Sequence, residues 1–259
     1  MRRKRPRRPT REALRRGIYL LPSLFTVGNM LAGFASILNA IEGRLELAGW
    51  LIFLAGLLDG LDGRVARLTR STSEFGKEYD SLADVVSFGV APAVLSFQWG
   101  LWQMGKLGWA AAFLFVVAGS VRLARFNVKA NVTDRSYFVG LPIPGGAGAI
   151  TLLVLIAPEP VRTPVASAGV FFFVLLVSLL MVSTIRYRSF KDFDLRQRWP
   201  AKAFFFIAAT VAMVAFQPLP TMGVVLGAYL LSGPLDWLAR KARKTPTKPD
   251  PQQEVPVGS

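Results

Sequence analysis

Four aspartates provide the side chains best able to do chemistry in this sequence: Asp59, Asp62, Asp80 and Asp84. Asp59 and Asp62 are three residues apart, and Asp80 and Asp84 are four apart, so each pair lies on one face of a helix. Carboxylates beside lipid are costly unless they pair, bind metal or take part in a reaction. The spacing predicts two helix ends that direct four carboxylates into one space, where one or two divalent cations offset their repulsion.

The residues between the two acid pairs fit a phosphate-containing ligand. Gly60, Gly63 and Gly76 have no side chains, so a bulky group can approach the backbone there. Arg67 can pair with a phosphate. Ion pairing of the acids with nearby cations in an ordinary interfacial loop is the alternative, but four acids with interleaved glycines favour a ligand site at the membrane surface.

The absence of two residue types narrows the chemistry further. The chain has no cysteine and no histidine. A general base must therefore be a carboxylate, a lysine or a tyrosine, and a metal site must be rich in oxygen. Oxygen ligands suit Mg²⁺, Ca²⁺ or Mn²⁺ better than Zn²⁺.

Composition predicts an integral membrane protein. Hydrophobic residues make up 52% of the 259-residue chain, and the mean hydropathy is +0.40, both high for a soluble domain. The net charge of +15 fits attraction to anionic lipid headgroups better than nucleic-acid binding, because the basic residues lie between apolar runs.

The apolar runs predict an all-α, polytopic membrane helix bundle of about eight transmembrane helices. We expect a disordered basic arm over residues 1–17, one membrane domain over 18–239 and a disordered basic, proline-rich tail over 240–259. The expected spans are about 19–40, 47 into the acidic stretch, 80–102, 107–124, 146–157, 165–185, 203–216 and 221–238.

Charge asymmetry orients these spans. With eight spans, 28 of the 31 Lys and Arg residues fall on the side of the two termini, which predicts that both termini are cytoplasmic. The acidic stretch then faces the cytoplasm. No small-residue cleavage site follows the first span, so we expect a retained helix in the cell (inner) membrane.

The acidic stretch resembles the signature of the CDP-alcohol phosphotransferase family, D-x2-D-G-x2-A-R-x8-G-x3-D-x3-D. The matching residues are Asp59, Asp62, Gly63, Ala66, Arg67, Gly76, Asp80 and Asp84. The resemblance implies a bundle of about six core membrane helices, usually dimeric, with a two-metal carboxylate site and a cytidine-diphosphate-linked donor.

The same resemblance implies roles for individual residues. Asp59, Asp62 and Asp80 would be the principal metal ligands, with Asp84 partly shared and also the candidate general base. The positions implied for the cytidine diphosphate are Gly63, Ala66, Arg67 and Gly76. Thr26 and Asn29 on the first helix are further candidates for this ligand, although a helix–helix hydrogen bond is an equal alternative for Asn29.

A finer resemblance extends along most of the chain. The segments DSLADVVSFGVAPA, RLARFN, GLPIP and MVSTIRYRSFK resemble the phosphatidylserine synthase branch. This implies transfer of a phosphatidyl group from CDP-diacylglycerol to L-serine with release of CMP, dependence on Mg²⁺ or Mn²⁺, contact with membrane lipids and a homodimer. The serine carboxylate needs a cation, for which Arg122 and Arg125 are the best placed.

Three alternatives stay open at this point. Another member of the family would use a glycerol phosphate or inositol phosphate acceptor, or an archaeal-type lipid donor. A cation transporter would place its acids nearer the middle of the spans. A membrane anchor that binds nucleic acid would act through the basic arm.

Overall fold

The computed structural model describes residues 11–69, 73–129, 137–188, 209, 212–213 and 216–243. The long helices are α1 (Arg11–Ile41), α2 (Leu45–Thr69), α3 (Glu74–Asp84), α4 (Ala91–Trp99), α5 (Lys106–Lys129), α6 (Ile143–Ile156), α7 (Pro164–Val182) and α9 (Pro218–Arg243). The shorter elements are the π-helix η1 (Val85–Val90), the 3₁₀-helix η2 (Leu101–Met104) and the strands β1 (Tyr137–Val139) and β2 (Arg186–Arg188).

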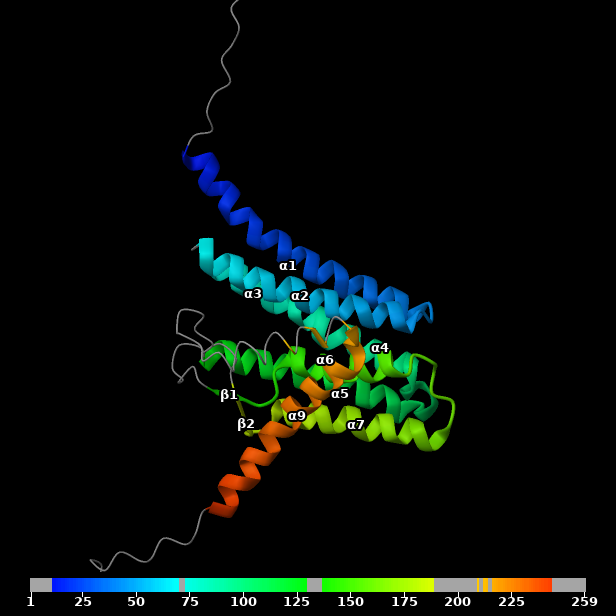
Figure 1. The fold of residues 1–259 in the computed structure, drawn as a ribbon. Coiled ribbons are helices and arrows are strands. Elements are labelled where there is room, and N and C mark those ends of the chain that lie inside the picture. Colours follow the sequence, from blue (N-terminus) through cyan, green and yellow to red (C-terminus); the bar gives the residue numbers. More distant parts are fainter. Residues whose placement is uncertain are drawn as a thin grey trace, which may run out of the picture.

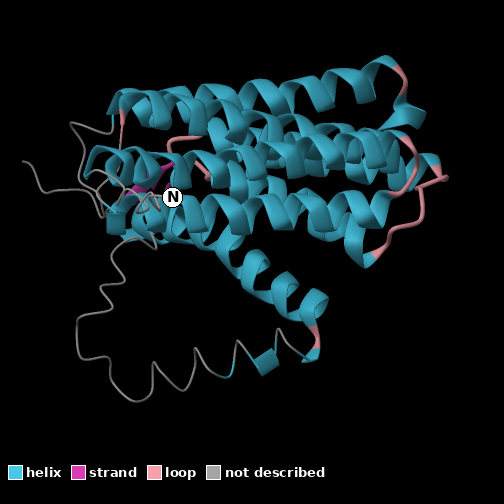
Figure 2. Cartoon of the chain, turned by 90° about the horizontal axis from the view of Figure 1, so that it is seen from above, coloured by secondary structure: helices cyan, strands magenta, loops and turns pink. Residues whose placement is uncertain are grey.

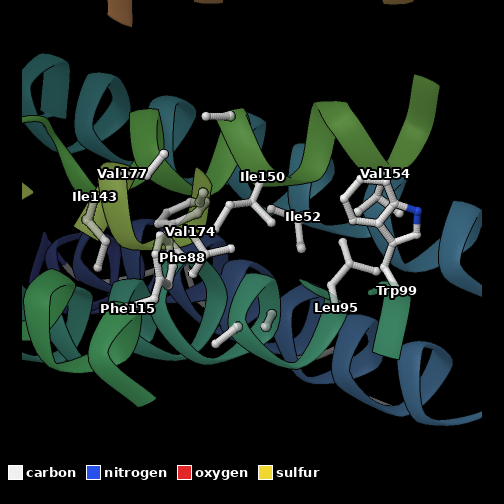
Figure 3. Packing of buried hydrophobic residues seen from close by; sticks show 14 of the residues in the cluster. Ile52, Phe88, Leu95, Trp99, Phe115, Ile143, Ile150, Val154, Val174 and Val177 are labelled. Atoms are coloured by element: carbon white, nitrogen blue, oxygen red, sulfur yellow. The ribbon is translucent and has the colours of Figure 1, made fainter. Parts of the chain in front are cut away.

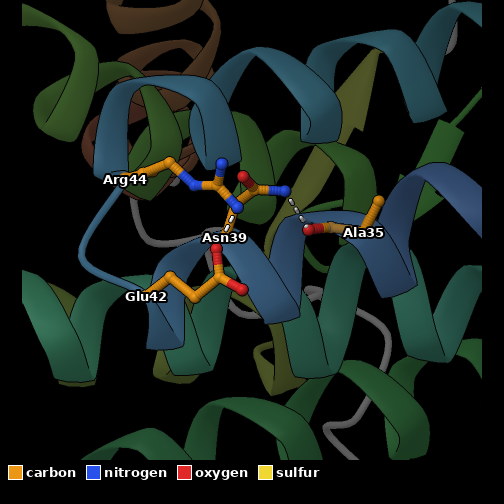
Figure 4. Close-up of polar contacts among 4 residues, drawn as sticks. All are labelled: Ala35, Asn39, Glu42 and Arg44. Carbon is orange, nitrogen blue, oxygen red and sulfur yellow. Dashed lines mark hydrogen bonds and ion pairs between the residues drawn. The ribbon is translucent and has the colours of Figure 1, made fainter.

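The helices form a bundle in which α1 and α2 lie side by side as an antiparallel pair (Figure 1). Their connection is tight because Gly43 adopts a left-handed conformation with φ of 77°. Asn39 donates a hydrogen bond to the carbonyl of Ala35 at 2.7 Å, and Arg44 pairs with Glu42 beside it (Figure 4). That ion pair is exposed, so it adds little stability; the pairing of α1 and α2 depends on packing.

The third rod of the bundle runs without a break from Glu74 to Trp99 through α3, η1 and α4. Its middle turn is π-helical at the point where it packs closely on α1. A side chain at Gly33 would place its Cβ only 2.7 Å from Cα of Ser87. Ser87 also donates a hydrogen bond to the carbonyl of Asn29 at 2.9 Å. Single π-turns inside helices are frequent at functional sites, and this one follows directly after Asp84.

The hydrophobic core lies where α2, α4, α5, α6 and α7 meet (Figure 3). Its largest fully buried side chains include Phe88, Leu95, Phe115 and Ile150. At one end of the bundle, Trp99 donates to the carbonyl of Ala157 at 2.7 Å and so joins two connections. The acidic residues lie at the opposite end of the bundle, where α2 ends and α3 begins.

Five helical segments are long and apolar enough to cross a membrane: Leu24–Ile41, Glu74–Trp99, Lys106–Val128, Pro164–Val182 and Pro218–Ala239. Many large apolar side chains on them are exposed, as expected of surfaces that face lipid. The chain is therefore an integral membrane protein. Helices α2 and α6 belong to the bundle but are not among these five segments. Helix α2 carries the acids Glu46, Asp59 and Asp62, and α6 has only 14 residues, a length of about 21 Å.

The predicted spans differ from the helices mainly at their ends. The first helix begins at Arg11, inside the arm expected to be disordered, and the third begins at Glu74, because Ser73 caps it. The last helix continues to Arg243. Residues 1–10, 244–259 and nearly all of the expected span 203–216 lie outside the described residues.

A small sheet and an oblique helix complete the fold. The sequence predicts helices only, yet β1 and β2 pair antiparallel, with Phe138 opposite Tyr187. Both segments lie in connections between predicted spans, β1 before α6 and β2 after α7. Helix α9 crosses the other helices obliquely (Figures 1 and 2) and contacts α6 and β2.

Candidate active site

Three carboxylates come together at the end of the bundle where α2 ends and α3 begins. Asp59 of α2 and Asp80 and Asp84 of α3 each offer one oxygen, and these oxygens lie within 4.8 Å of one another. All three side chains are at least partly buried. The predicted convergence of two helix ends is therefore confirmed for these three acids.

The fourth acid, Asp62, is held by the first helix. Its side chain is buried, with 7% of its surface exposed. The hydroxyl of Thr26 donates a hydrogen bond to Asp62 Oδ2. Asp62 acts electrostatically on Asp80, but it is not one of the three acids whose oxygens lie within 4.8 Å of one another.

Asn29 joins α1 to the other pair of acids. Its Nδ2 donates to Asp84 Oδ1 at 3.4 Å, and its backbone carbonyl accepts the bond from Ser87. The helix–helix hydrogen bond predicted as one role of Asn29 is thus confirmed. Thr26 and Asn29 lie three residues apart on one face of α1, and each contacts one of the acidic residues.

The donor set fits a hard divalent cation. All the groups are carboxylate oxygens, which Mg²⁺ and Mn²⁺ prefer. Among the described residues, Oδ1 of Asp62 and Oδ1 of Asp80 are buried without a hydrogen-bond partner. Buried charged oxygens of this kind are costly unless a cation or proton compensates them. The residues present are therefore suited to hold metal.

The two arginines predicted as acceptor ligands diverge. Arg122 is buried, with 5% of its surface exposed, and its guanidinium lies 5.3 Å from the ring centre of Phe126. It interacts electrostatically with Asp84. Arg125 instead donates through Nη1 to the carbonyl of Val182 at 3.0 Å, at the C-terminus of α7. Of these two arginines, only Arg122 thus has a resolved electrostatic interaction with one of the acids.

The sequence comparison agrees with this arrangement of acids on two adjoining helices. Residues 19–175 match the family described as CDP-alcohol phosphatidyltransferase. The chain belongs to the CDP-alcohol phosphatidyltransferase family. The matched range contains every acid of the site and ends within α7, before β2 and α9.

Several relatives carry the name CDP-diacylglycerol–serine O-phosphatidyltransferase. The protein from Helicobacter pylori (strain ATCC 700392 / 26695) is 40% identical over 222 residues, which cover 85% of this chain and 92% of the relative. That from Mycobacterium tuberculosis (strain ATCC 25618 / H37Rv) is 34% identical over 256 residues, covering 93% and 88%. The Methanocaldococcus jannaschii protein is 35% identical over 202 residues, covering 76% and 88%.

The remaining signature residues of this CDP-alcohol phosphatidyltransferase lie on the two helices that carry the acids. Gly63 is exposed on α2, and a side chain at Gly60 would meet nothing within 4 Å. The backbone N–H of Gly76 donates to Ser73 Oγ at 3.0 Å, so Gly76 belongs to the capped first turn of α3. Ala66 and Arg67 belong to α2, but their side chains lie outside the described part of the chain.

Sequence reasoning missed two groups at this site. Asn127 Nδ2 donates to Ser81 Oγ at 2.8 Å and ties α5 to the helix that carries Asp80 and Asp84. Tyr229 of α9 interacts electrostatically with Arg122. The RLARFN segment, which ends in Asn127, contained the signal for the first contact. No local pattern marks Tyr229, because α9 reaches the site only through the tertiary fold.

Proposed function

We propose that this chain is a CDP-diacylglycerol–serine O-phosphatidyltransferase. It transfers the phosphatidyl group of CDP-diacylglycerol to the hydroxyl of L-serine and releases CMP. The observation that carries the proposal is the 40% identity to the Helicobacter pylori protein of that name across 85% of this chain. The converging carboxylates of Asp59, Asp80 and Asp84 support it.

The acids are the cofactor site in this proposal. Asp59, Asp62, Asp80 and Asp84 hold Mg²⁺ or Mn²⁺, with two ions as the expected complement. Bound divalent cations supply positive charge that offsets the diphosphate oxygens and the charge that develops on the leaving CMP. Thr26 keeps Asp62 oriented, and burial of these groups strengthens each electrostatic interaction.

The chemical step exchanges a phosphoanhydride bond for a phosphoester bond. The serine hydroxyl oxygen bonds to the phosphatidyl phosphorus, and the bond from that phosphorus to the CMP oxygen breaks. The hydroxyl proton passes to a carboxylate oxygen of Asp84, the general base. Asn29 supports this role, because its Nδ2 restrains one oxygen of Asp84 and so helps to direct the other towards the acceptor.

The donor and the acceptor occupy different sides of the acids. Gly63, Ala66, Arg67 and Gly76 accommodate the cytidine diphosphate, and the acyl chains remain in the bilayer. Arg122 supplies the cation for the serine carboxylate. The protein lies in the inner membrane of the cell as a homodimer. Serine and CMP, the two water-soluble molecules, enter and leave the site from the cytoplasm.

A panel of acceptors tests the proposal. Purified protein in detergent is given CDP-diacylglycerol and Mn²⁺ or Mg²⁺ with serine, glycerol 3-phosphate or inositol 1-phosphate in turn, and CMP release is measured. Serine is expected to give CMP together with phosphatidylserine. CMP release with glycerol 3-phosphate but not with serine would show that the acceptor is assigned wrongly.

A further inference from the structure

Helix α3 carries two of the three converging acids, yet it buries little of its surface against the bundle. Of its 11 residues, all of which the structure describes, only Ala83 is buried. Phe75 and Leu82 leave 78% and 62% of their surfaces exposed. The buried π-turn holds the end of α3 at Asp84, but apolar packing does little to fix the preceding turn, which carries Asp80.

The two acids are also held weakly by their own hydrogen bonds. Asp80 Oδ1 is buried without a hydrogen-bond partner in the described part of the chain. Asn29 Nδ2 reaches Asp84 Oδ1 only at 3.4 Å, which is longer than usual for such a bond. The direction of both carboxylates therefore depends on how α3 as a whole is turned about its axis.

A hydrogen bond from α5 supplies the missing support. Asn127 Nδ2 donates to Ser81 Oγ at 2.8 Å, and Ser81 directly follows Asp80 in the chain. Ser81 Oγ in turn donates to the carbonyl of Lys77 at 3.0 Å. Because the hydroxyl proton is used in that second bond, the oxygen accepts from Asn127. The amide of Asn127 thus holds the turn of α3 that carries Asp80.

The end of α5 is itself anchored on another helix. Arg125 Nη1 donates to the carbonyl of Val182 at the end of α7, at 3.0 Å. Residues two apart on an α-helix point about 200° apart, so Arg125 and Asn127 lie on nearly opposite sides of α5. This end of α5 therefore joins α7 to α3, and Asn127 is a fixed point against which α3 is set.

The other flank of Asp80 contacts α1. The hydroxyl of Tyr79 donates to Sδ of Met30 at 3.9 Å. Tyr79 and Ser81 are the two chain neighbours of Asp80, so they point about 100° to either side of it. Asp80 thus lies on the face of α3 between a contact with α1 and a contact with α5.

We propose that Asn127 is a positioning residue that holds α3 so that Asp80 and Asp84 face Asp59 and together bind the divalent cation. The proposal rests on the proposed function and adds to it a residue outside the acidic signature, on a helix that carries none of the acids. Asn127 acts through Ser81 rather than by contact with the cation.

Binding of Mn²⁺ in the absence of substrates tests this role. The protein is titrated in detergent, and free Mn²⁺ is measured by its electron paramagnetic resonance signal. We expect Asn127→Ala and Ser81→Ala each to raise the Kd for Mn²⁺ about tenfold, the lower end of the effect of residues that support metal ligands.

Two further variants are the controls. Ser81→Thr keeps the hydroxyl and is expected to bind Mn²⁺ as the wild type does. If it binds as weakly as Ser81→Ala, the hydroxyl is not what matters and the proposal is overturned. Asn39→Ala removes an amide that bonds to the carbonyl of Ala35 at the other end of the bundle, and it is expected to leave the Kd unchanged.

A double-mutant cycle shows whether the two residues act through one contact. If they do, adding Asn127→Ala to Ser81→Ala raises the Kd little further, whereas an additive, roughly hundredfold rise would overturn the proposal. A lower melting temperature of metal-free Asn127→Ala with an unchanged Kd would also overturn it, because it indicates a packing role. Since the change acts on cation binding, saturating Mn²⁺ is expected to restore the turnover of Asn127→Ala.

The role of Asn127 and the proposed function fail in different ways. If the wild type binds Mn²⁺ and Asn127→Ala binds it equally well, only the role of Asn127 is overturned. If the wild type uses glycerol 3-phosphate rather than serine, the acceptor is assigned wrongly, whereas the Kd values still decide the role of Asn127. If the wild type binds no Mn²⁺, the cation site fails, and the role of Asn127 fails with it.

Discussion

The hydroxyl of Thr26 donates a hydrogen bond to Asp62, and both side chains are buried where α1 meets α2. This contact makes the first helix part of the acidic site, although α1 contributes no acid to the group of three. The hydrogen bond from Thr26 orients Asp62, the acid of the signature that is not part of the group formed by Asp59, Asp80 and Asp84.

Replacing Thr26 tests this role. Thr26→Val keeps the shape but removes the donor, which leaves Asp62 Oδ2 unsatisfied at a cost of about 1–3 kcal/mol. We expect kcat/KM for phosphatidylserine formation to fall at least tenfold. Thr26→Ser keeps the hydroxyl and is expected to retain most activity. Equal activity of the valine and serine variants would contradict the role.

A second prediction concerns the close packing of α1 on the π-turn. Gly33→Ala would bring a Cβ to within 2.7 Å of Cα of Ser87. Overpacking of this kind costs about 1–3 kcal/mol, and it displaces the turn that follows Asp84. We expect a lower melting temperature and reduced activity.

The matched control is another glycine in a helix. Gly169→Ala in α7 places its Cβ where no atom lies within 4 Å. Alanine is the better helix former, so stability is expected to stay equal or to rise. A Gly33→Ala protein as stable and active as Gly169→Ala would show that the contact with Ser87 is not close.

The third prediction separates chemistry from donor binding. Asp84→Asn removes the proposed base but keeps the side chain's size and its place beside Asn29. We expect turnover to fall by a factor of about 10²–10⁴, the typical contribution of a general base, while binding of CDP-diacylglycerol is largely retained. Near-normal turnover would exclude Asp84 as the base.

The fourth prediction concerns the cation requirement. Asp59→Asn removes one of the three converging carboxylates. Loss of a residue that hydrogen-bonds a metal ligand typically weakens metal affinity roughly 10–100-fold. Because Asp59 is itself a proposed ligand, we expect the Mn²⁺ concentration for half-maximal activity to rise by more than that. Glu159→Gln removes an exposed acid between α6 and α7 and is expected to leave the requirement unchanged. Equal requirements in both variants would contradict a metal site at Asp59.

The sequence predicted the position of three of the four acids correctly. Helical spacing predicted that the acids converge, and Asp59, Asp80 and Asp84 do so, with oxygens within 4.8 Å of one another. It did not separate Asp62 from the other three, since that depends on Thr26, which lies in another helix. The two short strands were missed because three-residue segments have no measurable periodicity.

For the two arginines, spacing along the helix did not predict which groups they contact. Arg122 and Arg125 are three apart, and sequence reasoning assigned them to one pocket. The fold separates them, because Arg125 donates to the carbonyl of Val182 at the end of α7. A helix end with unsatisfied carbonyls attracts a cation, and only the packing of α5 on α7 determines which arginine reaches it.

The most direct test of the account is incorporation of radiolabelled L-serine into lipid. Purified wild-type protein with CDP-diacylglycerol is assayed with Mn²⁺, with Mg²⁺ and after chelation of divalent cations. The account predicts labelled phosphatidylserine and an equal amount of CMP with a divalent cation, and neither product after chelation. Cation-independent labelling, or CMP release without labelled lipid, would contradict it.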